Sequence, residues 1–203
     1  AFAAVCGIAG VGYLGLAVNG AAAAWGLASW FFYAWVYTPL KPLTAAHTTV
    51  GAVAGALPVF IGWSAVGGTL DMTADPRALA LFLVVFLWQF PHFMAIAWLY
   101  RRQYAQAGLR ALTVVDPSGC QAALQAVTTC LALLPVSLVT CLLTAGQGRW
   151  WFLGVTFLLG VAQLVCAVRF LGRRDDETAR RLLRATLLYL PALLTCLVLA
   201  AIH

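Results

Sequence analysis

The chain has 203 residues, of which 64% are hydrophobic and only 9% are charged, and its net charge is +6. A water-soluble domain of this length has roughly a quarter charged residues, and it could not bury so much apolar surface. The composition therefore excludes an ordinary soluble domain and favours a protein that crosses a lipid bilayer.

Long apolar runs, separated by charged or Pro- and Gly-containing breaks, indicate helices that span the membrane. A span needs about 20 apolar residues, and a backbone inside lipid must satisfy its hydrogen bonds within a helix or a closed barrel. The runs lack the alternation of apolar and polar residues that is typical of barrel strands. We therefore predict an all-α, polytopic transmembrane helical bundle that forms a single membrane domain, residues 1–203. The seven expected spans are 2–18, 22–39, 46–67, 78–100, 120–145, 150–170 and 184–202.

Basic residues are divided unevenly between the two sets of loops. One set holds Lys41, Arg101, Arg102, Arg110, Arg169, Arg173, Arg174, Arg180, Arg181 and Arg184. The other set holds only Arg77 and Arg149. Because cytoplasmic loops are enriched in Lys and Arg, we expect the basic loops to be cytoplasmic, with Ala1 inside and His203 outside. The simplest host is a bacterial plasma (inner) membrane, and the net charge then reflects membrane topology rather than nucleic-acid binding.

The fourth expected span contains polar side chains, in the sequence WQFPHF of residues 88–93. Polar groups inside a membrane are unfavourable and often functional, and Gln89 and His92, three residues apart, share a helix face. Two interpretations remain open. The pair could form a polar strip in a cavity of the bundle, or it could only hydrogen-bond neighbouring helices.

Four further features of the sequence are of interest. In residues 100–110, arginines and tyrosines at the membrane mouth suit a phosphate or a carboxylate, although contact with lipid headgroups is the simpler explanation of the arginines alone. Lys41 is the only lysine, and at a helix end its ammonium could snorkel or meet a phosphate. We interpret residues 169–184 as a solvated loop with internally paired charges. Gly51 and Gly55 form a GxxxG pair, which allows close helix packing and by itself indicates no chemistry.

Three stretches of the chain resemble the haem-modifying branch of the UbiA-type intramembrane prenyltransferases, the protohaem IX farnesyltransferases or haem O synthases. These stretches are YTPLK at 37–41, GAVAGALPVFIGW at 51–63, and WQFPHF at 88–93 with YRRQYAQAG at 100–108. The similarity is dense from residue 33 to 119 and remains collinear beyond it.

The resemblance implies a reaction in which a farnesyl group passes from farnesyl diphosphate to a vinyl group of haem B, forming haem O. It also implies Mg²⁺ bound through the diphosphate and two acidic motifs, and it makes terminal-oxidase assembly factors candidate partners. The implied catalytic residues are Lys41, Arg101 and Tyr104, of which the first two would hold diphosphate. The implied substrate-binding residues are Tyr37, Gln89, His92 and Arg102, and Gln103 occupies the position of the second metal motif.

The chain also departs from the family pattern. The family has nine spans, and its first acidic motif precedes the region matched here. Gln103 replaces the usual Asp, and a neutral amide is a poorer magnesium ligand than a carboxylate. Pro42 and His47 replace the usual Arg and Asn, and Asp116 is the nearest remaining carboxylate.

From these departures we expect the C-terminal seven helices of a UbiA-type fold, either as a piece of a longer enzyme or as a diverged member. We expect the 203 residues alone not to transfer a farnesyl group. The alternatives are a non-catalytic haem-binding scaffold or assembly factor, and a quinone-type prenyltransferase.

Overall fold

The computed structural model describes residues 2–67, 70–71, 75–144 and 149–202, and all regular structure within these ranges is helical. The elements are α1 (Phe2–Ala17), α2 (Gly20–Phe31), the π-helix η1 (Phe32–Tyr37), α3 (Thr38–Leu40), α4 (His47–Ala56), α5 (Pro58–Ala65), α6 (Pro76–Leu99), α7 (Arg101–Gln106), α8 (Leu112–Val115), α9 (Cys120–Thr144), α10 (Arg149–Arg173) and α11 (Asp176–Ile202).

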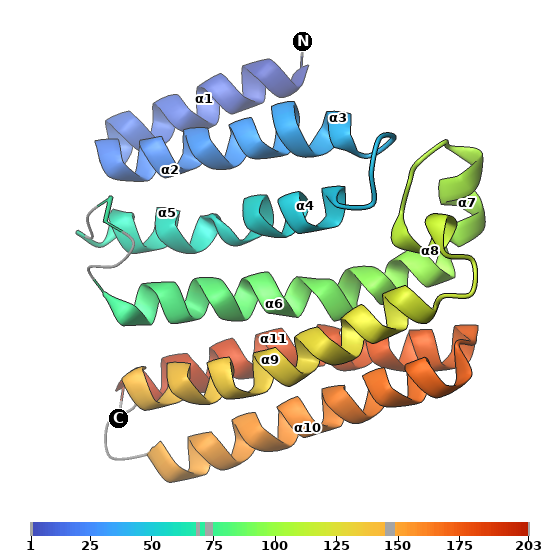
Figure 1. Cartoon of the computed structure of the whole chain (residues 1–203). Helices are drawn as coiled ribbons and strands as arrows, with labels where there is room; N and C mark the ends of the chain where they lie inside the picture. Colours follow the sequence, from blue (N-terminus) through green and yellow to red (C-terminus); the bar gives the residue numbers. More distant parts are fainter. Residues whose placement is uncertain (1, 68–69, 72–74, 145–148, 203) are drawn as a thin grey trace.

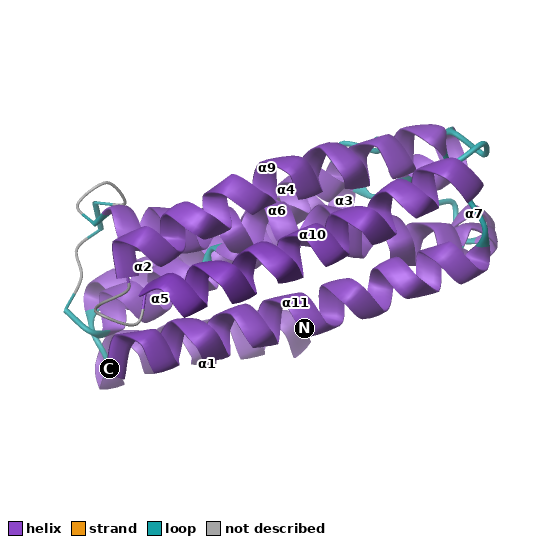
Figure 2. Ribbon diagram, turned by 90° about the horizontal axis from the view of Figure 1, so that it is seen from below, coloured by secondary structure: helices purple, strands orange, loops and turns teal. Residues whose placement is uncertain are grey.

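The long helices lie side by side with nearly parallel axes, as two views at right angles show (Figure 1, Figure 2). In the described part of the chain, α2, η1 and α3 form one helical rod, and α4 and α5 form another. Together with α1, α6, α9, α10 and α11 they make seven rods. Among the described residues, five of these rods are long and apolar enough to cross a membrane, namely α4 with α5, α6, α9, α10 and α11, and α1 is a shorter apolar helix. The protein is thus an all-α, polytopic integral membrane protein, which confirms the predicted fold class.

Two of the rods are interrupted near their middle. The helix of the α4 and α5 rod is interrupted at Leu57, because Pro58 has no N–H to continue the hydrogen-bond ladder. In the second rod the π-turn η1 closes with a bond from the Thr38 N–H to the Tyr33 carbonyl. The extra residue in a π-turn changes the direction of the side chains that follow it, and this turn precedes the segment that contains Lys41.

The segment 169–184 is not the loop that we predicted. α10 continues to Arg173 and α11 begins at Asp176, eight residues before the expected start at residue 184. Asp175 caps the new helix, since its Oδ1 accepts from the Thr178 N–H at 2.8 Å, and acidic side chains in the first turn suit the positive end of a helix. Some of the expected charge pairing is present, between Arg173 and Asp175 and between Glu177 and Arg181.

α6 lies at the centre of the bundle and contacts α4 and α5 on one side and α9 and α11 on the other (Figure 1). Alanines at 122, 123 and 126 of α9 are fully buried, which lets α9 approach α6 closely. One buried cluster joins α6, α9, α10 and α11 around Met94, Trp98 and Phe170. Residues at both ends of α6 are therefore held by helices from both halves of the chain.

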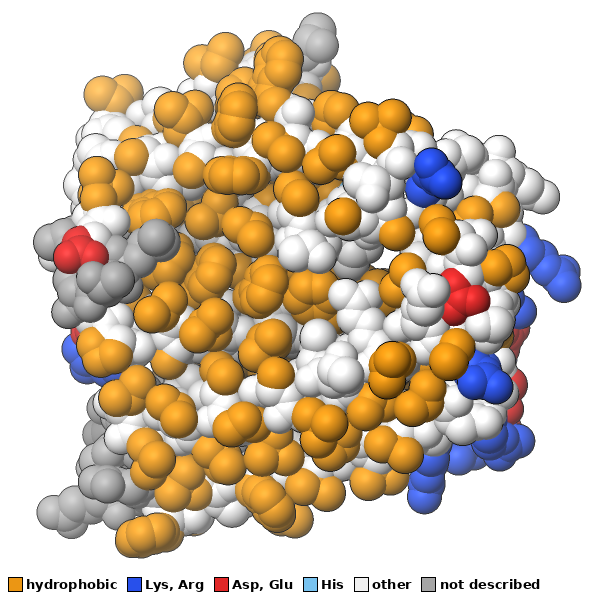
Figure 3. All heavy atoms as spheres, viewed as in Figure 1, with side chains coloured by type: hydrophobic (Ala, Val, Ile, Leu, Met, Phe, Trp, Pro, Cys, Tyr) orange, Lys and Arg blue, Asp and Glu red, His pale blue; other side chains and the backbone are white. Residues whose placement is uncertain are grey.

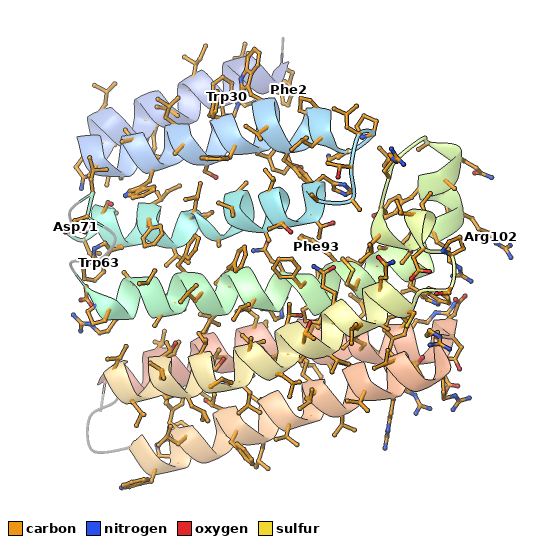
Figure 4. All side chains as sticks on the ribbon, viewed as in Figure 1. Phe2, Trp30, Trp63, Asp71, Phe93 and Arg102 are labelled. Carbon is orange, nitrogen blue, oxygen red and sulfur yellow. The ribbon has the colours of Figure 1, made fainter. Side chains whose placement is uncertain are left out.

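Charged side chains gather at the two ends of the bundle. Most of the blue side chains in Figure 3 lie at the end that also carries α7, and Figure 4 places Arg102 at that end and Asp71 at the opposite one. The ribbon places the end of α11 on the Asp71 side, opposite the basic end (Figure 1). Ala1 and His203, whose sides we predicted, lie outside the described residues.

Candidate functional site

A cavity of about 290 Å³ opens at the basic end of the bundle, between the segment after α3, α4, α6 and the loops around α7 and α8. Figure 3 shows that this face is hollowed near the end with most of the blue side chains, and Figure 4 shows Phe93 between α4 and α6. The cavity is lined by Tyr37, Lys41, His47, Thr48, Phe93, Met94, Ile96, Ala97, Tyr104, Leu109 and Ala111. It therefore has a polar mouth and an apolar wall that is built mainly by α6.

Three of the predicted site residues meet at this cavity: Tyr37, Lys41 and Tyr104. The Lys41 ammonium lies 4.4 Å from the centre of the Tyr37 ring and 5.7 Å from that of Tyr33. Such cation–π contacts hold an ammonium in place without neutralising its charge. Within the described residues Lys41 has no carboxylate partner, so its positive charge remains available to an anion.

Tyr37 reaches this position because glycine lies beneath it. A Cβ atom at Gly51 would lie 2.7 Å from the Tyr37 ring, closer than a side chain permits. On its other side Tyr37 packs against His47, with 5.8 Å between ring centres, and His47 Nδ1 lies 2.8 Å from the Thr44 carbonyl oxygen. The sequence marked His47 only as a departure from the family, whereas the structure makes it part of the cavity wall.

Tyr104 stands across the mouth on α7. Burial, with a contribution from Tyr100, raises the pKa of the Tyr104 hydroxyl above its usual value of 10.0. Tyr104 is therefore a neutral phenol at physiological pH, and it can donate a hydrogen bond to an anionic ligand.

Gln89 is 5% exposed and does not line the cavity; its side chain connects α6 to α4. Its Nε2 donates to the Ala52 carbonyl at 3.0 Å and to the Val85 carbonyl at 3.1 Å. A Cβ atom at Gly55 would lie 2.2 Å from Gln89 Oε1. The GxxxG pair that we interpreted as a packing motif thus makes room for two predicted substrate-binding side chains, Tyr37 at Gly51 and Gln89 at Gly55.

His92 points toward α11 rather than α4, so Gln89 and His92 diverge although they lie three residues apart. His92 Nδ1 lies 3.0 Å from Thr186 Oγ1, and that hydroxyl donates its proton to the Leu183 carbonyl at 2.7 Å. His92 Nδ1 must then be the donor, which leaves the lone pair of a neutral ring on Nε2, the form in which histidine can bind iron. Trp88 stacks on His92 and donates from Nε1 to the Thr186 carbonyl at 2.8 Å.

Arg101, Arg102 and Gln103 are not among the residues that line the cavity. The Arg101 guanidinium bonds the Trp98 carbonyl at 2.6 Å and Asp176 at 3.0 Å, and it lies 4.4 Å from the Trp98 ring. Arg102 is exposed and points away from the bundle (Figure 4), and Gln103 is exposed as well. Arg101 therefore joins α6 to α11 in this structure, and the diphosphate-holding role that the resemblance implied for it remains a prediction.

Sequence reasoning missed the apolar and small residues that complete the cavity wall. Thr48, Met94, Leu109 and Ala111 all line the cavity, although none of them has a distinctive chemistry. Only their positions next to the matched motifs could have indicated them.

The residues that the structure describes do not fit a magnesium ion. They contain no group of three or more His, Cys, Asp or Glu side chains that could hold a metal, and the cavity lining includes no carboxylate. Gln103, at the family's metal position, offers a neutral amide on an exposed surface. The Asp116 carboxylate accepts from the Ser118 hydroxyl at 2.6 Å and from the Gln121 N–H at 2.8 Å, so it caps the start of α9.

The described residues thus form an apolar helical bundle with a cationic, tyrosine-lined cavity mouth above an apolar wall. The chain belongs to the UbiA prenyltransferase family, whose model matches residues 1–200. It is 43% identical to the Protoheme IX farnesyltransferase of Rhodopirellula baltica, covering 99% of this chain and 71% of that protein. It is 43% identical to the enzyme of the same name from Solibacter usitatus, covering 94% of this chain and 63% of that protein.

A mitochondrial Protoheme IX farnesyltransferase from Arabidopsis thaliana is 36% identical over 98% of this chain, which corresponds to 45% of that protein. The chain therefore spans between less than half and about seven tenths of the length of these relatives. No solved structure matches the chain significantly.

Substituting Gly55 with alanine will destabilise the bundle. The new methyl group would displace Gln89 and leave a buried carboxamide without its partners, which costs about 1–3 kcal/mol. Gly62→Ala is the matched control, because a Cβ atom there meets nothing within 4 Å and alanine is the better helix former. We expect thermal unfolding in detergent to show a lower midpoint for Gly55→Ala and an unchanged or higher one for Gly62→Ala. Equal midpoints for the two variants would contradict the proposed contact.

The stability of the protein will depend on pH through Asp116. Hydrogen bonds from the Ser118 hydroxyl and then the Gln121 N–H lower the pKa of Asp116 below its usual 3.8. A lowered pKa in the folded state adds stability that is present above pH 3.8 and is lost as the pH falls through the folded value. Asp116→Asn should therefore unfold at a lower temperature than the wild type at pH 7, and the gap should close at strongly acidic pH. A gap of the same size at both pH values would contradict this role.

Proposed function

We propose that the protein transfers a farnesyl group from farnesyl diphosphate to a vinyl group of haem B, forming haem O. One observation carries the proposal: an unneutralised lysine, Lys41, lies between tyrosines at the mouth of an apolar cavity. Relatives named Protoheme IX farnesyltransferase, which match nearly the whole chain, support the choice of farnesyl and haem as substrates.

The cavity mouth suits the diphosphate end of the donor. When the allylic C–O bond breaks, both electrons leave on the diphosphate, and nearby positive charge stabilises the leaving group. Lys41 supplies such a charge, and the neutral Tyr104 hydroxyl can donate a hydrogen bond. Both groups lie at the edge of an apolar wall, where the effective dielectric constant is lower than in bulk water and charge interactions are stronger.

The apolar wall suits the reacting carbon atoms. The allylic cation must meet the vinyl group before water reaches it, and Phe93, Met94 and Ile96 present no nucleophile. The aromatic faces of Tyr37 and Phe93 can also stabilise the cation electrostatically. The π electrons of the vinyl group form the new carbon–carbon bond, and water then quenches the resulting cation with loss of a proton.

The family resemblance makes His92 the candidate haem contact, on the α11 side of α6 and outside the cavity lining. Its Nε2 keeps the lone pair that iron binds, and Trp88 and Thr186 fix the plane of its ring. We infer no step through magnesium, since the described residues do not fit that ion.

The same proposal orients the protein in its membrane. The basic end, which holds Lys41 and the ends of α7 and α10, faces the cytoplasm, where the water-soluble farnesyl diphosphate is dissolved. α11 ends on the opposite side. We place the protein in a bacterial plasma membrane, with terminal-oxidase assembly factors as candidate partners.

The test uses the purified 203 residues and, for comparison, the complete protein as its gene encodes it. Each is incubated in lipid nanodiscs with haem B, farnesyl diphosphate and Mg²⁺, and the haem products are separated and identified by mass. We expect haem O from the complete protein and none from the 203 residues alone. In the complete protein Lys41→Met should lower the rate at least about tenfold, because a charge-assisted contact of 1.5–3 kcal/mol is lost.

Arg180→Met serves as the control, because Arg180 is exposed on α11 far along the chain from the cavity and its loss should leave the rate unchanged. Haem binding without any haem O would favour the scaffold alternative, and farnesylation of an aromatic quinone precursor instead of haem would favour the quinone-type enzyme. Full activity of Lys41→Met would contradict the role of the cavity mouth.

A further inference from the structure

We propose that Arg110 is the second cation of the diphosphate site and acts with Lys41, in the place that the family resemblance gave to Arg101. This inference rests on the proposed function, since it names the group that holds the donor's diphosphate. Arg110 ends the basic segment 100–110, but it lies outside the three stretches that carry the family resemblance and is not among the residues that line the cavity.

The backbone brings Arg110 to the cavity mouth. Its N–H donates to the Lys41 carbonyl at 2.9 Å, so the loop after α7 is attached to the segment after α3 at the residue that carries the ammonium. The two residues beside it in the chain, Leu109 and Ala111, both line the cavity. The backbone of Arg110 therefore lies at the cavity mouth beside Lys41, while its guanidinium reaches the Leu43 carbonyl on the segment after α3.

The Arg110 guanidinium remains largely free to bind a ligand. A guanidinium has five N–H donors, and the structure gives this one a single long bond, from Nη1 to the Leu43 carbonyl at 3.4 Å. The side chain is exposed, and it has no carboxylate partner among the residues that the structure describes. Its charge, like that of Lys41, is not neutralised.

Arg101 is in the opposite situation. It bonds the Trp98 carbonyl and the Asp176 carboxylate and lies against the Trp98 ring, so its donors and its charge are already engaged between α6 and α11. To reach the cavity it would have to break these contacts, whereas Arg110 would give up only one weak bond.

The pair matches the chemistry of a diphosphate. A guanidinium can bind two oxygen atoms of one phosphate group at once, while an ammonium acts as a point charge on the other. Two uncompensated cations at a mouth whose lining has no carboxylate attract an anion with several charges. Arg110 also lies on the loop that holds the backbone of Lys41, so bound diphosphate would join the two segments.

The test measures binding of inorganic pyrophosphate to the 203-residue chain by titration calorimetry. The chain is held in nanodiscs of neutral phosphatidylcholine, so that no anionic headgroup competes, and EDTA removes divalent ions. We expect wild-type binding, and we expect Arg110→Gln to weaken it at least about tenfold, as the loss of a charge-assisted contact requires. Arg110→Lys, which keeps the charge but loses the two-oxygen contact of the guanidinium, should weaken binding less than Arg110→Gln, and the exposed control Arg180→Gln should not differ from wild type.

Arg110→Gln keeps the backbone N–H that bonds the Lys41 carbonyl, so a merely structural role of this position would spare the variant. Unchanged binding by Arg110→Gln, equal losses in the Lys and Gln variants, or no wild-type binding would each overturn the proposal. Circular dichroism and thermal unfolding of each variant establish that it is folded. Because the probe contains neither farnesyl nor haem, pyrophosphate binding without haem O formation would support the two-cation site while contradicting the proposed haem reaction.

Discussion

The hydrogen bonds from Gln89 to the backbone of α4 and of its own helix hold the two sides of the cavity together. Its amide is buried in an apolar bundle, where a polar group without a partner costs several kcal/mol, so the contact is both strong and specific in its geometry. Gly55 is needed for this contact, and Gly51, one turn away, makes room for Tyr37 in the same way. The spacing between α4 and α6 therefore depends on Gly55, and the spacing between α4 and η1 at the cavity mouth depends on Gly51.

α6 distributes its functional side chains between two neighbours. Gln89 faces α4, while Trp88 and His92 face α11 through Thr186, and Arg101 continues that contact through Asp176. The cavity side is left with apolar residues such as Phe93 and Met94. One face of α6 thus carries the hydrogen bonds to α11, and another face forms the apolar wall of the cavity. This arrangement suits the proposed reaction, which must exclude water.

Most of the fold could be predicted from the sequence. The length of the apolar runs and the absence of alternating apolar and polar residues predicted the helical rods, because lipid leaves the backbone few alternatives to a helix. The prediction of a loop between 169 and 184 was wrong, because a high density of charged residues indicates exposure to water and does not exclude a helix. α10 and α11 extend beyond their apolar runs at their basic ends. The motif at 88–93 was singled out for its polar residues, but three-residue spacing could not show that Gln89 and His92 would contact different helices.

The sequence by itself determined a membrane bundle, a basic end and a family resemblance, since composition, charge and motifs are local properties of the chain. Only the tertiary structure decided which polar residues meet. It placed Tyr37, Lys41 and Tyr104 around one cavity and engaged Arg101 elsewhere. It also brought Arg110, which lies outside the three stretches that carry the family resemblance, beside Lys41. These outcomes depend on contacts between segments far apart in the chain, and neither propensity nor spacing encodes such contacts.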